Sequence, residues 1–307
     1  MVAFYIIFFN IVGNFGNFHI IYLTMTRKEL RGKSAYLQCA SSFFHAVCLL
    51  YELFNAYFLI FGIQLRRYQC YPIESGYVVF ASMQTVCMLM MLVDILSLVL
   101  LPMRYRTYQT GPYVLKMLIP GFVFGMIFAI WGFMHMDDEV LIFCNPPIAL
   151  IPSISHTWMA CNFAINSTVF ALLVVIIILM HYRGKGRGET QRVVRRLKVI
   201  TAIFVFSWYS ATLGHTIINI FFDEESTLSV FLTSNMIFFV LIIYSQAFYV
   251  IMWRSKEYRS AFIAMYSNFA FLQRFAPSTI TVTVTSSVVQ TNSREPVNRK
   301  STRATVA

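Results

Sequence analysis

The sequence is poor in charged residues, which make up 12% of its 307 residues, while 58% are hydrophobic. Soluble domains carry about 25% charged and about 45–50% apolar residues, so the composition excludes an ordinary soluble globular protein. The six cysteines form no CxxC pair and no His/Cys spacing of the zinc type. This excludes a dense disulfide scaffold and gives no reason to expect a metal site.

The sequence also lacks the common catalytic signatures: it has no phosphate-binding loop, no HExxH motif and no paired catalytic carboxylates. We therefore expect no enzyme and no cofactor. Acidic residues are scarce, 13 against 24 Lys and Arg, and a net charge of +11 could indicate a nucleic-acid partner. The basic residues lie between apolar blocks, however, so membrane topology explains them better and no nucleic acid is expected.

Seven apolar stretches are long enough to cross a bilayer, which takes about 20 helical residues. Lipid offers backbone amides no hydrogen-bond partners, so these stretches must be helices despite their many β-branched and aromatic residues. The first is expected to be a retained helix and not a signal peptide, because its basic cluster follows the apolar run. The expected fold class is an all-α integral membrane protein, a seven-transmembrane helix bundle. The expected spans are residues 2–24, 35–62, 73–101, 113–134, 153–182, 198–222 and 228–252.

The distribution of Lys and Arg predicts the orientation, because short cytoplasmic loops are enriched in these residues. Alternate loops and the C-terminal tail together hold 22 of them, whereas the remaining loops hold only Arg66 and Arg67. We therefore expect a multi-pass plasma-membrane protein with its N-terminus outside and its C-terminus in the cytoplasm. The acidic runs at residues 137–139 and 223–225 then fall in outer loops.

Cys70 and Cys144 are the two cysteines expected on the outer side, where an oxidising compartment preserves disulfides. The other four lie inside apolar stretches and behave there as small hydrophobic residues. We predict a Cys70–Cys144 disulfide, with two free thiols as the alternative.

Several local motifs resemble those of rhodopsin-like G-protein-coupled receptors. Gly16-Asn17 followed by Leu30-Arg31 resembles the GN…LR pattern of the first helix, and Asp94 followed by residues 102–106 (PMRYR) resembles the end of the third helix and its loop. Residues 254–259 (RSKEYR) resemble the start of a short helix eight, expected at 253–266. Across residues 10–266 the sequence is most similar to the nematode serpentine chemoreceptors of the Srsx class.

The sequence departs from the receptor pattern at several switch positions. Ile95 occupies the place of the DRY arginine, and His45 that of the helix-two aspartate, which disfavours a bound sodium ion because hard cations prefer oxygen ligands. Phe204 and Trp208 resemble the FxxxW toggle. Tyr249 ends the run 245–249 (SQAFY) at the expected NPxxY site, and a register shift of two would put Ile251 there.

We expect two acids inside the spans, Asp94 and Glu52, and we propose a role for each. Asp94 lies about 21 residues, or roughly 30 Å, into the third span, at the expected cytoplasmic boundary. We expect it to form a conformational latch with a basic residue of the inner loops; the alternative is an interfacial acid that reaches water or is neutral. The resemblance extends switch roles to Phe204, Trp208 and Tyr249.

Glu52 is the second acid, and an ionisable residue in the outer half of a bundle indicates ligand contact. The alternative is a buried glutamate paired with a neighbouring helix. Tyr77 stands where amine receptors carry an aspartate, which disfavours an amine, although Glu52 leaves a cationic ligand open. The expected pocket suits a small, largely apolar molecule or a short peptide. Its expected lining residues are Glu52, Tyr77, Gln84, Trp158, Asn162, Trp208, His215 and Asn219.

The C-terminal residues 267–307 are expected to form a disordered cytoplasmic tail following the receptor domain 1–266. From Pro277 onward this segment holds twelve Ser or Thr and no aromatic residue. Phosphorylation at Ser301 and Thr302 would add negative charge and create a site for an arrestin-type partner.

These features predict a chemosensory G-protein-coupled receptor of the lipid bilayer that binds an extracellular ligand between the outer halves of its helices and signals to a heterotrimeric G protein. A neuropeptide-type receptor of the same fold is one alternative. A transporter is the alternative from another class, and it would show inverted repeats and matching interrupted helices, which the sequence lacks.

Overall fold

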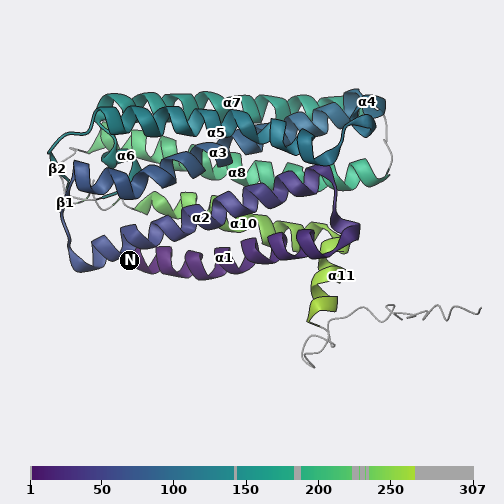
Figure 1. The fold of residues 1–307 in the computed structure, drawn as a ribbon, viewed down its shortest axis with the longest axis horizontal. Helices are drawn as coiled ribbons and strands as arrows, with labels where there is room; N and C mark the ends of the chain where they lie inside the picture. Colours follow the sequence, from purple (N-terminus) through teal and green to yellow (C-terminus); the bar gives the residue numbers. More distant parts are fainter. Residues whose placement is uncertain are drawn as a thin grey trace, which may run out of the picture. The chain divides into compact units, whose positions relative to one another are not determined.

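The structure is a computed structural model that describes residues 2–141, 144–182, 188–222, 228, 232 and 235–266. Seven of the helices described are long and apolar enough to cross a membrane, which confirms the predicted all-α bundle and a multi-pass membrane protein. These helices run alongside one another (Figure 1). They are α1 (Val2–Thr26), α2 (Lys33–Phe61), α3 (Arg67–Leu100), α5 (Thr110–Met134), α7 (Pro152–Tyr182), α8 (Gly188–Phe221, with its membrane window at Val194–Gly214) and α10 (Ile237–Arg254).

The helix ends differ from the sequence prediction because apolar length does not define where a helix begins. The start of α3 lies at Arg67, six residues earlier than expected, where the Gln69 side chain accepts a hydrogen bond from Arg66 N at 3.3 Å. The helix α8 begins ten residues before the start of its expected span at residue 198. The helix α10 begins nine residues after the start of its expected span at residue 228. The earlier starts of α3 and α8 place polar residues inside these two helices.

Two short strands that are distant in the sequence pair at one end of the bundle, which we call the hairpin end (Figure 1). Strand β1 (Leu65–Arg66) pairs antiparallel with β2 (Val140–Leu141), with Leu65 opposite Leu141. The Cys70–Cys144 disulfide is present, with Cα atoms 5.7 Å apart, and confirms the predicted pairing. The short helix α6 (Pro146–Ala149) follows it.

The charges of this end complement one another. Arg67, 4% exposed at its side chain, pairs with Asp137 and Glu139, and Arg66 pairs with Asp138 at 2.9 Å. The two basic residues that sequence reasoning places in the outer loops thus neutralise the acidic run of the next outer loop.

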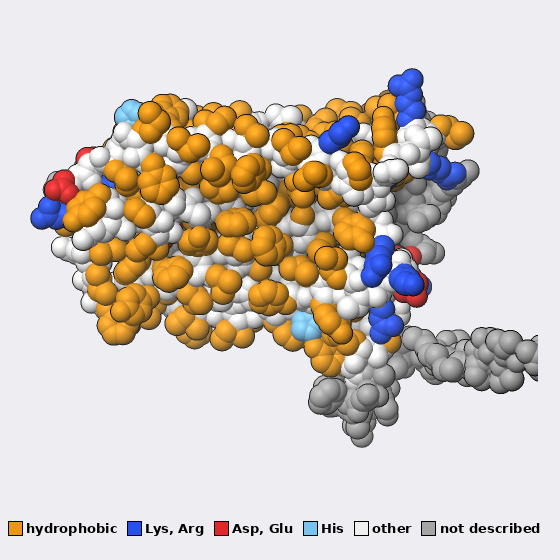
Figure 2. Space-filling view, viewed as in Figure 1, with side chains coloured by type: hydrophobic (Ala, Val, Ile, Leu, Met, Phe, Trp, Pro, Cys, Tyr) orange, Lys and Arg blue, Asp and Glu red, His pale blue; other side chains and the backbone are white. Residues whose placement is uncertain are grey.

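The opposite end carries short helices that run between or after the spans. They are η1 (Lys28–Leu30), α4 (Pro102–Thr107) and α11 (Lys256–Met265). The helix α11 is the predicted helix eight, but it begins at Lys256 because Trp253 and Arg254 still belong to α10. Figure 2 shows hydrophobic side chains over the middle of the visible face and charged side chains at its two ends.

The interface between α1 and α10 is unusually close. A Cβ atom added at Gly16 would lie 2.6 Å from Phe248 Cβ, so only glycine permits this approach. Asn17 Nδ2 donates to the Tyr244 carbonyl oxygen at 2.9 Å. Polar groups in lipid must be paired internally, so this hydrogen bond anchors α10 to α1.

Candidate functional site

Five buried polar side chains from three helices meet near the hairpin end. They are Glu52 and Asn55 of α2, Glu74 and Tyr77 of α3, and Tyr244 of α10, all at most 6% exposed. We call this group the dicarboxyl cluster. It lies within a few turns of the disulfide, because Glu74 follows Cys70 by only four residues of α3.

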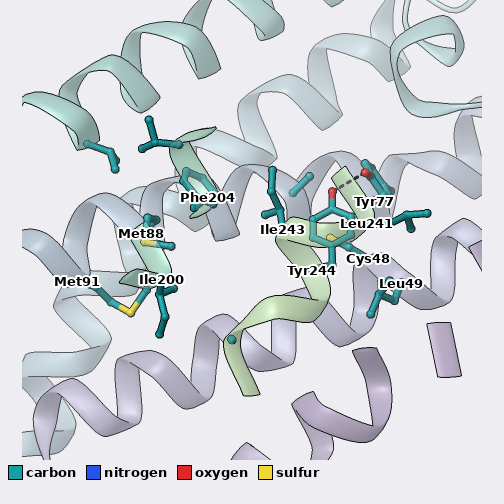
Figure 3. Close-up of a cluster of buried hydrophobic side chains, with 14 of the residues drawn as sticks. Cys48, Leu49, Tyr77, Met88, Met91, Ile200, Phe204, Leu241, Ile243 and Tyr244 are labelled. Atoms are coloured by element: carbon teal, nitrogen blue, oxygen red, sulfur yellow. Dashed lines mark hydrogen bonds between the residues drawn. The ribbon is translucent and has the colours of Figure 1, made fainter. Parts of the chain in front are cut away.

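The cluster is held by short hydrogen bonds. Asn55 Nδ2 donates to Glu52 Oε2 at 2.9 Å, and the Tyr77 and Tyr244 hydroxyl groups lie 2.5 Å apart (Figure 3). The Tyr77 side chain also lies within hydrogen-bonding reach of Glu52. Two predicted ligand residues, Glu52 and Tyr77, are therefore neighbours.

Glu74 corrects the expectation that only Glu52 and Asp94 are acids inside the spans. Glu74 falls inside the expected span 73–101, and in the structure it lies two turns from the start of α3 and is 0% exposed. Neither of its carboxyl oxygens has a hydrogen-bond partner within the described residues, and the charge of Glu52 acts on it. An acidic residue within an apolar run was the signal that could have identified it.

Tyr244 is the other member that sequence reasoning does not single out. Its hydroxyl group faces Tyr77 and Cys48, while its carbonyl oxygen receives the Asn17 amide. No local sequence motif identifies Tyr244 as a site residue. Its place in the cluster depends on how α10 is rotated against α2 and α3.

The remaining predicted ligand residues divide between α3, α7 and α8. Trp158 Nε1 donates to Ser82 Oγ at 3.0 Å, and Asn162 Nδ2 donates to the Trp158 carbonyl oxygen at 2.8 Å. Gln84 is buried on α3. None of these contacts reaches the dicarboxyl cluster in the part of the chain that the structure describes.

Two predicted switch residues of α8 pack differently. Phe204 is 1% exposed and belongs to the core group drawn in Figure 3, together with Met88 and Ile243. Trp208 is partly buried, with its ring 5.6 Å from that of Phe163 on α7. The side chains of His215 and Asn219, further along α8, lie outside the described part, as do Ser301 and Thr302 of the tail.

Tyr249, the third predicted switch residue, lies on the outer face of α10. Its side chain is 43% exposed, and its hydroxyl group donates to the Val12 carbonyl oxygen of α1 at 2.9 Å. Ile251, the alternative in the shifted register, is fully buried. The switch role of Tyr249 stays a prediction.

Asp94 is fully buried among aromatic and basic side chains at the end of the bundle opposite the hairpin. Lys33 of α2 attracts the carboxylate, and the Tyr105 and Tyr113 side chains lie beside it. The Lys33 ammonium group lies 4.3 Å from the Tyr105 ring centroid and 5.3 Å from that of Tyr113. Lys33 is therefore a basic residue available to Asp94 for the predicted latch.

The Tyr105 phenol group beside Asp94 stays protonated. Burial and the Asp94 charge raise the pKa of Tyr105, which lies on α4 outside the spans. Within the part of the chain that the structure describes, the Asp94 oxygens and the Tyr113 hydroxyl group have no hydrogen-bond partner, so the arrangement is mainly electrostatic.

Helix α11 is attached to the bundle through Tyr258, which is 2% exposed. Its hydroxyl group lies 3.2 Å from Thr24 Oγ1 of α1, and the Arg196 guanidinium of α8 lies 5.3 Å from its ring centroid. Ser255 Oγ accepts from Tyr258 N at 3.4 Å and helps to start the helix. One side chain thus joins α1, α8 and α11.

Seven membrane-length helices, a disulfide from α3 to the loop after α5 and a short helix after the last span define the architecture of a G-protein-coupled receptor. The family model described as serpentine type 7TM GPCR chemoreceptor Srsx matches residues 10–266, and the chain belongs to this family. No curated protein matches the chain significantly. The predicted family is confirmed, and it is a family of receptors.

Proposed function

We propose that the protein is a chemosensory receptor of the cell surface that binds an extracellular small molecule or short peptide and activates a heterotrimeric G protein. The observation that carries the proposal is the dicarboxyl cluster, a set of buried polar groups from three helices within a chain of a chemoreceptor family. Ionisable residues inside a membrane bundle are costly and usually have functions.

The proposed orientation puts the hairpin end outside. Two observations support it. The first is that the disulfide lies at this end, since disulfides persist in the oxidising conditions outside the cytoplasm. The second is that the loops at the opposite end and the C-terminal tail carry most of the Lys and Arg residues, as is typical of the cytoplasmic side. The N-terminus of α1 then lies outside, and α4 and α11 face the cytoplasm.

A ligand entering from outside would bias the packing of α2, α3 and α10. A ligand shifts a conformational equilibrium only by its different affinity for the two states. The Asp94–Lys33 region and the Tyr258 attachment of α11 are the inner contacts whose rearrangement would expose a G-protein surface. Phosphorylation of Ser301 and Thr302 would then allow an arrestin-type partner to bind the tail.

Calcium and cyclic AMP reporters in cells that display the full chain test the proposal. Panels of small molecules and of short peptides are applied, and the wild type is compared with untransfected cells. We expect at least one ligand to give a saturable, G-protein-dependent response. Silence in every reporter at confirmed surface expression would contradict the proposal, and accumulation of a labelled compound inside the cells would favour a transporter.

A further inference from the structure

We propose that Glu52 and Glu74 together bind the positively charged group of the ligand, an ammonium or related organic cation, with tyrosine rings around it. This inference rests on the proposed receptor function and specifies its ligand class. It adds Glu74, Tyr51 and Tyr244 to the predicted site, and it reverses the expectation from Tyr77 that disfavours amines.

The first argument is the missing counter-charge. Glu52 and Glu74 are 2% and 0% exposed, and no Lys, Arg or His of the described residues lies within 4.0 Å of either carboxyl group. Glu52 is partly compensated by the Asn55 amide, but both oxygens of Glu74 lack a partner in the same described set. Burying an ionised carboxylate without a partner is costly, and a bound cation would supply the missing counter-charge.

The second argument is the mutual effect of the two acids. The charge of Glu52 acts on Glu74, so the pair repel one another when both are ionised. A single cation between them would remove this repulsion and pair both groups at once. A neutral ligand could only donate hydrogen bonds and would leave the repulsion in place, and an anionic ligand would add to it.

The third argument is the aromatic surroundings. The ring centroid of Tyr77 lies 6.4 Å from that of Tyr51 and 6.4 Å from that of Tyr244. A Cβ atom added at Gly76 would lie 1.9 Å from the Tyr51 hydroxyl oxygen, so this phenol end lies directly against α3, two residues from Glu74. Aromatic faces attract organic cations, most strongly where water is excluded.

The position of the pair suits a ligand that enters from the hairpin end. Glu74 lies one turn, or about 6 Å, along α3 from the disulfide-bonded Cys70. In the structure the cluster is closed to solvent. Opening at this end would therefore accompany cation entry.

Thermal unfolding of the purified full-length receptor in lipid nanodiscs tests the proposal without any G protein. The probes are butylammonium and phenethylammonium, each compared with the alcohol of the same carbon skeleton. A ligand that binds the folded state raises Tm with concentration. We expect an ammonium probe to raise Tm and its alcohol not to, and we expect Glu74→Gln to weaken the apparent affinity at least about tenfold.

A second readout separates a ligand site from a structural acid. Without probe, Glu74→Gln should raise Tm, because the neutral amide is no longer repelled by the Glu52 charge. Asp138→Asn is the matched control: it removes an exposed acid at the same end and should leave the probe response unchanged. If Glu74→Gln does not reach the membrane, Glu52→Gln carries the same affinity test, since a glutamine oxygen still accepts from Asn55.

Three results would overturn the inference. They are equal Tm shifts from ammonium and alcohol probes, wild-type probe affinity in the glutamine variant, and no shift by either ammonium probe at millimolar concentration. Each of these leaves the receptor function itself intact, because the cell reporters measure signalling to any ligand class. A silent reporter screen with clear ammonium binding would instead contradict the G-protein proposal alone.

Discussion

The hydroxyl groups of Tyr77 and Tyr244 lie 2.5 Å apart and join α3 to α10 inside the dicarboxyl cluster. Tyr244 is also held by Asn17 through its carbonyl oxygen. The last membrane helix is thus connected to α1 and α3 at one residue, next to the proposed ligand site.

A double-mutant cycle tests this connection. Tyr77→Phe and Tyr244→Phe should each lower the free energy of unfolding by about 1 kcal/mol, since each removes the same interhelical hydrogen bond. The double variant should cost about as much as one single variant. Urea or thermal unfolding of the purified receptor measures the three values, and full additivity would contradict a shared bond.

Removal of the disulfide is expected to destabilise the hairpin end. Cys70→Ser should cost about 2–5 kcal/mol, because the bond closes a loop with a sequence separation of 74 residues. Surface labelling and thermal unfolding measure the effect. Cys161→Ser, which removes a thiol from α7, is the control, and the double variant at 70 and 144 should be no worse than the single one. Equal loss from Cys161→Ser would contradict a specific role of the bridge.

The Asp94–Lys33 pair is expected to restrain the inactive state. Asp94→Asn and Lys33→Met should each raise basal signalling about 5-fold or more at matched surface level, the lower end of ordinary allosteric coupling. The exposed neighbour Lys28 supplies a control, since Lys28→Met changes the same net charge without facing Asp94. Unchanged basal and ligand-driven signalling in Asp94→Asn would remove the latch.

Attachment of α11 through Tyr258 is expected to depend on the ring more than on the hydroxyl group. Tyr258→Ala should cost about 3 kcal/mol through the cavity it leaves, and Tyr258→Phe about 1 kcal/mol or less. Burial raises the pKa of Tyr258, so its phenol is neutral at physiological pH and the Thr24 contact persists. Thermal unfolding compares these variants with Tyr182→Ala, which removes a ring that is 82% exposed. Equal effects at both sites would refute the attachment.

Much of the fold follows from the sequence because lipid restricts the choices. Apolar length alone predicts seven helices, and location alone predicts the pairing of Cys70 with Cys144. Helix ends are less predictable, since a polar residue such as Arg67 joins α3 when ion pairs satisfy its side chain. Glu74 already lies inside the expected span 73–101, so the sequence-based count of two acids overlooked it.

The site is only partly predictable for a different reason. Glu52 and Tyr77 stand out individually as an acid in a span and a residue at a defined distance from Cys70. Their contact with Tyr244, and that of Asp94 with Lys33, depends on how helices distant in the sequence rotate against one another. Tyr249 shows the same limit, because its sequence position resembles a core switch while its side chain faces outward.

The orientation of the bundle is the central claim, since it decides which end meets ligands and which end meets the G protein. Epitope tags at the N-terminus and at the C-terminus of the full chain, stained before and after permeabilisation, measure it directly. We expect the N-terminal tag to be labelled on intact cells and the C-terminal tag only after permeabilisation. C-terminal labelling on intact cells, or both tags on one side, would contradict it.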